Sequence, residues 1–176
     1  MNNYFISDFH LGHANIIKYC GRPFKSLEHM NREIIRRHNE RVKPKDTVFF
    51  LGDFCFKNTK GGKKGEGDLL KAEEYLKQLN GRFIFIKGNH DNNNSLKTII
   101  NSVVIELGGM KINLVHNPAD INPNYKINLV GHVHEKWKFK KCKKVDMINL
   151  SCDVWGFKPM RFEEIMKEYN KWKRGK

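Results

Sequence analysis

The sequence has little of several features that mark whole classes of protein. No apolar run approaches the roughly eighteen residues needed to span a bilayer, so we expect no membrane partner. The four cysteines form no CxxC pair and no framework spacing, which favours reduced thiols over disulfides. Residues 1–3 lead directly into an apolar run, without the basic and hydrophobic regions of a signal peptide. For a chain of 176 residues, these absences predict one cytoplasmic domain over residues 1–176.

Positive charge, in contrast, is abundant. The 33 Lys and Arg residues outnumber the 19 Asp and Glu residues, which gives a formal net charge of +14. Such an excess favours an anionic substrate or partner, although a lysine-rich genome produces the same composition without one. Residues 136–144 hold six lysines in nine positions, interleaved with Trp137 and Phe139. This segment has two interpretations: a surface that tracks a nucleic-acid strand, or a solvated hairpin whose aromatic side chains face the core.

Five short apolar runs are each followed by residue types that bind metal ions. In chain order, residues 4–7 precede Asp8 and His10, residues 48–51 precede Asp53, residues 83–86 precede Asn89, His90 and Asp91, residues 112–115 precede His116, and residues 127–130 precede His132 and His134. Runs of this length and composition predict buried strands, and open α/β sheets bind ligands at the carboxyl ends of their strands. Residues i and i+2 of an extended chain project to the same side, so we expect Asp8 and His10 to reach one ion from extended backbone.

The segments between these runs predict helices and one hairpin. Apolar residues recur at helical spacing in residues 26–42, 69–79 and the segment after Pro159, with Ser26 and Asp68 as N-caps, and shorter helices are expected over residues 14–19 and 96–100. Gly108-Gly109 predicts a two-residue turn between strands at 103–107 and 110–115, and residues 146–152 predict a further strand. Residues 57–67, rich in Gly and Lys, predict a mobile basic loop that does not match a phosphate-binding P-loop. The alternation of strands and helices indicates an α/β fold.

Together these strand ends carry more metal-ligand capacity than one ion needs. A tetrahedral zinc site takes three or four ligands, whereas two ions bridged by a carboxylate use about seven. The residues concerned are Asp8, His10, Asp53, Asn89, His90, His116, His132 and His134. Each could instead be ordinary turn chemistry, but independent turns would not readily place such residues after five successive strands.

The ordered motifs D-x-H, G-D, G-N-H-D, H and G-H-x-H resemble those of the calcineurin-like metallophosphoesterase superfamily, over nearly the whole chain. The resemblance implies a four-layer sandwich of two mixed β-sheets flanked by helices, with a binuclear metal centre. By motif, one ion would be held by Asp8, His10, Asp53 and His134, and the other by Asp53, Asn89, His116 and His132. His90 would stabilise the phosphoryl oxygens or protonate the leaving group, and Asp91 would orient His90.

This resemblance also implies a reaction: hydrolysis of a phosphodiester by in-line attack of a metal-bridging hydroxide. Mn²⁺ is the expected metal, with Fe, Zn²⁺ or Ni²⁺ as alternatives that ligand type does not separate. The segment after Asp53 lacks the second acid and the arginine of the protein Ser/Thr phosphatase motif GDxxDRG, and the third motif ends in Asp91 rather than Glu. The chain therefore resembles the small bacterial or phage-type phosphodiesterases of the superfamily.

Two alternative functions stay open. The first is a nuclease or nucleic-acid phosphatase, whose partner would be a nucleic acid or a nucleotide. The second is a non-catalytic interaction scaffold on the same fold, although such members would be expected to lose ligands. The sequence does not indicate the oligomeric state. Near the first motif, His13, Cys20 and Arg22 could contact a metal ligand or the substrate, but we expect packing roles for them. We assign no role to Asp153 or Trp155.

Overall fold

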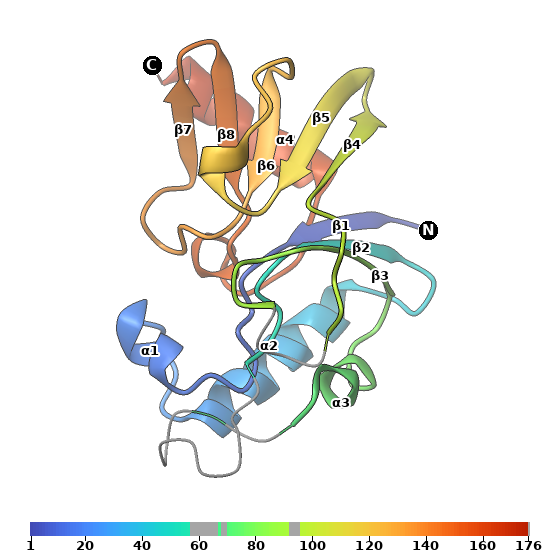
Figure 1. Ribbon diagram of the computed structural model, residues 1–176, viewed down its shortest axis with the longest axis vertical. Helices are drawn as coiled ribbons and strands as arrows, with labels where there is room; N and C mark the ends of the chain where they lie inside the picture. Colours follow the sequence, from blue (N-terminus) through green and yellow to red (C-terminus); the bar gives the residue numbers. More distant parts are fainter. Residues whose placement is uncertain (57–66, 68–69, 92–95, 176) are drawn as a thin grey trace.

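Two β-sheets pack face to face in the computed structural model, which describes residues 1–56, 67, 70–91 and 96–175 (Figure 1). The four-stranded sheet has the order β3 (Arg82–Ile86), β2 (Thr47–Leu51), β1 (Asn3–Ile6) and β9 (Met160–Arg161), with the first three parallel and β9 antiparallel. The five-stranded sheet has the order β4 (Ser102–Leu107), β5 (Met110–Val115), β6 (Ile127–Val130), β8 (Val145–Asn149) and β7 (Phe139–Cys142). In this sheet β5, β6 and β8 are parallel, and β4 and β7 are antiparallel edges.

Helices α2 (Leu27–Arg41) and α3 (Ala72–Leu76) cover the four-stranded sheet on the side away from the second sheet. Two more helices are the short α1 (Asn15–Tyr19), whose Ile16 joins the same core, and α4 (Phe162–Arg174). Val48 and Phe50 of β2 pack in one core with Met30 of α2 and Tyr75 of α3, whereas Phe49, between them in sequence, packs in the core shared by the two sheets. Both faces of β2 are therefore buried, which explains why its sequence is apolar without alternation.

The second sheet is covered in a different way. Ile165 and Tyr169 of α4 join the core that lies between the two sheets, so α4 packs on the inner side of the five-stranded sheet. Ile121 and Trp137 pack against the residues of its other face, next to the 3₁₀ helix η2 (Pro118–Asp120). The expected α/β architecture of two mixed sheets flanked by helices is confirmed.

Some of the predicted helix ends and turns agree with the structure, and others do not. Helix α2 begins as expected, with the Ser26 hydroxyl accepting a hydrogen bond from the backbone N–H of His29 at 3.2 Å. The glycines of the β4–β5 turn have φ of 57° and 72°, as a type I′ hairpin requires. Helix α3 is shorter than predicted, and its backbone at Lys71 is capped by the carboxylate of Glu74 at 2.8 Å. The predicted cap Asp68, and most of the Gly/Lys-rich segment, lie outside the described residues.

Two further expectations concern residues that flank strands. The helix predicted over residues 96–100 is wrong: these residues are not helical, and the carbonyl of Ile100 accepts a hydrogen bond from Lys87 N–H at 2.7 Å. A backbone hydrogen bond to Lys87, just after β3, is thus formed in place of helical hydrogen bonds.

The lysine-rich segment, residues 136–144, leads into and forms part of the β7–β8 hairpin. Lys140 and Lys141 are exposed there, and Phe139 is packed in the core. The hairpin interpretation of this segment is therefore confirmed.

None of the four cysteines forms a disulfide; Cys55 and Cys152 are buried, Cys20 is half-buried and Cys142 is exposed. Within the described residues, no helix combines the length and the hydrophobicity needed to span a bilayer.

Candidate metal centre

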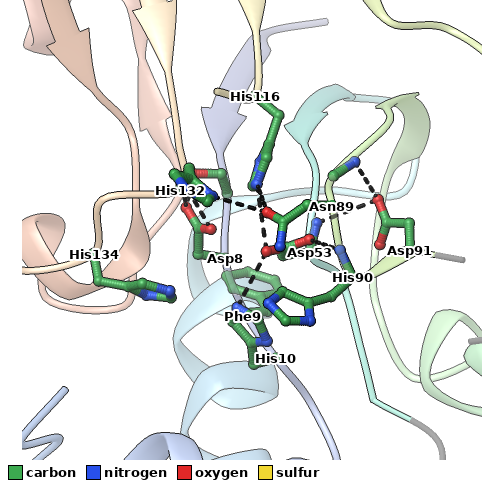
Figure 2. A network of polar contacts seen from close by, with 12 residues as sticks. Asp8, Phe9, His10, Asp53, Asn89, His90, Asp91, His116, His132 and His134 are labelled. Atoms are coloured by element: carbon green, nitrogen blue, oxygen red, sulfur yellow. Dashed lines mark hydrogen bonds and ion pairs between the residues drawn. The ribbon is translucent and has the colours of Figure 1, made fainter. Parts of the chain in front are cut away.

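The carboxyl ends of strands from both sheets meet at one edge and carry all nine predicted site residues (Figure 2). Strands β1, β2 and β3 deliver the first three motifs, and β5 and β6 deliver the last two. Ser7, directly after β1, bridges in parallel to Ser151, two residues after the end of β8. Ser7 N–H donates to the Leu150 carbonyl, and Cys152 N–H donates to the Ser7 carbonyl, both at 3.0 Å. These bonds join the two sheets beside the site.

The backbone at the site is not extended, contrary to the expectation for Asp8 and His10. Their φ angles are 59° and 49°, and Asp53, His132 and His134 also have positive φ, between 49° and 71°. These five are among only seven non-glycine residues with positive φ in the described chain. Left-handed backbone costs roughly 1–2 kcal/mol per residue for most side chains, and such strain clusters at functional sites. The motifs that follow β1, β2 and β6 therefore turn sharply after their strands, which directs these five side chains towards the site.

Glycines in the motifs make room for these side chains. A Cβ atom added to Gly131 would lie 2.6 Å from Ser7 Oγ and 2.8 Å from Asp8 Oδ2. At Gly52, whose φ is 84°, it would lie 2.6 Å from both the Gly88 Cα and His116 Nδ1. The glycines that precede Asp53 and His132 thus permit the close approach of neighbouring motifs.

Two groups of donor atoms form within the site. We call Asp8, His10 and His134 the first subsite and Asp53, His116 and His132 the second subsite; within each, one ligand atom per residue lies within 4.8 Å of the others. Asn89 Oδ1 adjoins the second subsite, 2.9 Å from His116 Nε2 and 2.8 Å from His132 Nδ1.

Asp53 connects the two subsites. Its Oδ2 lies 3.5 Å from His10 Nε2 and 3.3 Å from His116 Nε2. Its Oδ1 accepts a hydrogen bond from the backbone N–H of His90 at 2.9 Å. A single carboxylate oxygen therefore faces imidazole nitrogens of both subsites.

The electrostatics of the site favour a bound cation. Burial disfavours protonation of His116 and His134, but hydrogen bonds with Asp53 and Asp153 outweigh it and raise their pKa values to about 9 and about 10. Burial raises the pKa of Asp8; for Asp53, burial also acts to raise the pKa, but its contacts with His116 and His10 lower it overall. Asp53 thus keeps a negative charge inside a buried site and favours positive charge on the groups around it.

The donor set fits divalent metal ions. His10 Nε2 is buried and has no hydrogen-bond partner among the described residues, although a buried polar nitrogen is normally paired. Around it stand carboxylate oxygens and imidazole nitrogens, with the Asn89 amide oxygen close by, which together suit Mn²⁺, Fe or Zn²⁺. A cation would supply the partner that His10 lacks.

The third motif places His90 at the surface and Asp91 in the interior. The His90 side chain is exposed, with its ring centroid 5.5 Å from that of His10. The Asp91 carboxylate accepts hydrogen bonds from the backbone N–H groups of Gly88 at 2.7 Å and of Asp53 and Phe54 at 3.2 Å. Asp91 therefore fastens the third motif to the second; that it also orients His90 stays a prediction.

Sequence reasoning missed two residues, Arg22 and Asp153. Asp153 lies 3.1 Å from His134 Nδ1 and is paired with Arg22, for which we expected packing rather than a contact with a metal ligand. Arg22 and Asp153 are 131 positions apart, so no local pattern links them. One signal was present, because Asp153 follows the apolar strand β8 just as the predicted ligands follow theirs. Cys20 also lies near His134 and Asp153, but the Asp153 oxygens are taken by Arg22 and Ser151.

Comparisons with known proteins show the family and the fold of the chain. The sequence model of the calcineurin-like phosphoesterase superfamily domain matches residues 1–151. An uncharacterized protein of Methanocaldococcus jannaschii is 39% identical, over 97% of this chain and 92% of its own length. The crystal structure of a protein of unknown function from Aquifex aeolicus is similar with a TM-score of 0.67 and 27% identity, covering 94% of this chain and 98% of that one.

Proposed function

The chain belongs to the calcineurin-like phosphoesterase superfamily, and on this basis we propose that it hydrolyses phosphodiesters with two divalent metal ions. The observation that carries the proposal is the position of Asp53 Oδ2, which faces His10 of the first subsite and His116 of the second. A carboxylate in this position suits a bridge between two ions. Two bound cations would neutralise the phosphate and lower the pKa of a bound water molecule towards neutrality.

The protein groups around the site have distinct roles in this proposal. Asp8, His10, Asp53 and His134 hold one ion, and Asp53, Asn89, His116 and His132 hold the other. His90, exposed beside His10, hydrogen-bonds a phosphoryl oxygen or donates a proton to the leaving oxygen. The excess of lysine and arginine over acidic residues attracts the anionic substrate.

Two hollows beside the site support a diester over a monoester. One, of about 550 Å³, is lined by Asn89 and His116 together with Asn101 and Asn117. The other, of about 300 Å³, is lined by His10, His90 and His134 together with Tyr19 and Lys136. A phosphodiester carries two ester groups, and the two hollows offer a separate place for each. Because His90 lines the smaller hollow, we assign that hollow to the leaving group.

The choice of metal is part of the proposal. Carboxylate and amide oxygens beside imidazoles suit Mn²⁺, Fe, Zn²⁺ and Ni²⁺ alike, and of these we propose Mn²⁺. Metal-stripped protein should therefore regain activity with Mn²⁺.

The test is hydrolysis of bis-p-nitrophenyl phosphate, a diester, beside p-nitrophenyl phosphate, a monoester. We expect metal-stripped protein to be inactive, Mn²⁺ to restore cleavage of the diester in preference to the monoester, and His90→Ala to lose it. His29→Ala, which removes a histidine of α2 outside the site, is the matched control and should keep full activity. Folded protein that cleaves neither substrate with any divalent metal would refute the proposal and leave the scaffold alternative.

A further inference from the structure

Arg22 is a buried cation behind the first subsite. Its side chain is fully buried and pairs with the Asp153 carboxylate through two hydrogen bonds, from Nε to Oδ1 at 2.8 Å and from Nη2 to Oδ2 at 3.0 Å. This two-pronged geometry is specific to arginine, because lysine offers a single charged nitrogen. The Asp153 side chain is only 3% exposed, so the pair is closed off from solvent.

The same guanidinium also holds the first motif. Arg22 Nη2 donates to the Asp8 carbonyl at 2.7 Å, and Nη1 donates to the Phe9 carbonyl at 2.8 Å. These carbonyls belong to the turn in which Asp8 and His10 adopt left-handed backbone. Hydrogen bonds from a charged donor to both carbonyls fix that turn, and with it the direction of two ligand side chains.

Asp153 in turn holds the third ligand of the first subsite. Its Oδ2 lies 3.1 Å from His134 Nδ1 and accepts a further hydrogen bond from the Ser151 hydroxyl at 2.8 Å. With Nδ1 committed to Asp153, His134 has Nε2 left for an ion. A carboxylate that binds the second nitrogen of a histidine ligand fixes its tautomer and ring orientation.

We propose that Arg22 and Asp153 are positioning residues that set the metal affinity of the first subsite, Asp8, His10 and His134. The inference rests on the proposed function in that it takes this subsite to bind an ion. One buried ion pair contacts all three parts of the subsite: Asp8 directly, His10 through the Phe9 carbonyl before it, and His134 through Asp153. No corresponding ion pair stands behind the second subsite among the described residues, where His116 Nδ1 lies 2.7 Å from the Leu51 carbonyl.

Stepwise titration of metal-stripped protein with Mn²⁺, followed by calorimetry, tests the proposal without reference to turnover. Asp153→Asn keeps the shape of the side chain but removes its charge, and we expect about 10- to 100-fold weaker binding of one ion. The affinity for the other ion should stay within about threefold of wild type. Arg22→Lys keeps the charge but not the two-pronged geometry, and it should weaken the binding of the same ion. It serves as the second variant if Asp153→Asn does not fold.

The matched control is Asp146→Asn. Asp146 is a buried carboxylate of β8 that accepts hydrogen bonds from Tyr169 at 2.7 Å and Lys173 at 3.1 Å, outside the site. Its substitution should lower the melting temperature and leave both metal affinities unchanged. Wild-type affinities in folded Asp153→Asn or in Arg22→Lys would overturn the inference while leaving the proposed function intact. Wild-type protein that binds no divalent ion would instead refute the proposed function, and the inference with it.

Discussion

The two subsites are built from similar ligands but supported differently. Behind the first, a buried arginine–aspartate pair holds His134 and the turn at Asp8. The second is held by backbone and amide groups: His116 lies against the Leu51 carbonyl, and Asn89, which contacts both of its histidines, is exposed. The larger hollow also adjoins the second subsite. The comparison indicates a preorganised first subsite and a more open second one. We therefore expect an ion in the first subsite to be bound more tightly than an ion in the second.

The largest effect should come from removing the group that the two subsites share. Asp53→Asn exchanges the bridging carboxylate for an amide, and we expect it to abolish binuclear metal binding because neither subsite keeps its shared anionic ligand. Metal content measured after gel filtration should fall from two ions per chain to one or none. Two ions retained in the variant would contradict the assignment of Asp53 as a bridge.

His90→Ala should separate metal binding from chemistry. His90 lies beside both subsites, but the proposal gives it a contact with substrate rather than with metal. We expect two bound ions and a fall in kcat of about 10²- to 10⁴-fold, as for the loss of a general acid. Full activity in this variant, or loss of an ion from it, would show that the role of His90 is misassigned.

His38 is a buried histidine that belongs to neither subsite, and its environment contrasts with that of the site histidines. His38 of α2 lies 2.8 Å from the Asn80 carbonyl through Nε2, and its Nδ1 is buried without a hydrogen-bond partner among the described residues. Burial lowers its pKa to about 4, against a usual value of 6.5. As pH falls below 6.5 the unfolded state takes up the proton first, so this contribution to stability is complete above pH 6.5 and is lost towards pH 4.

The expected loss at pH 5 is about 2 kcal/mol relative to neutral pH. Urea denaturation of metal-stripped wild type and His38→Gln at both pH values measures it, since glutamine can donate the same hydrogen bond without titrating. The pH dependence should be smaller in the variant by about this amount. Equal pH dependence in the two proteins would show that His38 does not titrate as described.

The smallest effect should come from the cationic edge of the second sheet. Lys140 and Lys141 of β7 are exposed, whereas the neighbouring Phe139 packs against Trp155, Tyr169 and Trp172 and is not free to stack on a base. Lys140→Glu with Lys141→Glu should therefore change diester hydrolysis less than twofold, and activity on small diesters should vary little with salt. Steep loss of activity on RNA with added salt, abolished by the double substitution, would favour the nuclease alternative.

Much of the site could be predicted because its residues follow apolar strands in sequence. Residues 48–51 indicate a buried strand from composition alone, and the position of Asp53 at its end follows from the topology of parallel sheets. The turns at these strand ends could not be predicted, because left-handed backbone at Asp8 and His10 depends on hydrogen bonds from Arg22 and to Gly52 and Asp53. The intrinsic conformational preferences of non-glycine residues do not predict left-handed backbone at particular positions.

Long-range pairs account for the rest of what sequence reasoning missed. Arg22 could be read as a packing residue because its partner lies 131 positions away, and a buried ion pair has no local signature. The predicted helix over residues 96–100 failed for a related reason: a backbone contact with Lys87 outweighs a weak helical propensity. Local pattern thus predicted most of the elements and the residues that meet at the site, whereas tertiary contacts determine how those residues are held.

The most direct test of the central claim is electron paramagnetic resonance of metal-stripped protein titrated with Mn²⁺. If Asp53 bridges two ions, the spectrum at two equivalents should show the multiline signal of an exchange-coupled pair, and Asp53→Asn should show only isolated Mn²⁺. The Asp146→Asn protein should give the coupled signal like wild type. A wild-type spectrum that contains only isolated Mn²⁺ at saturating metal would contradict the binuclear centre on which the proposed function depends.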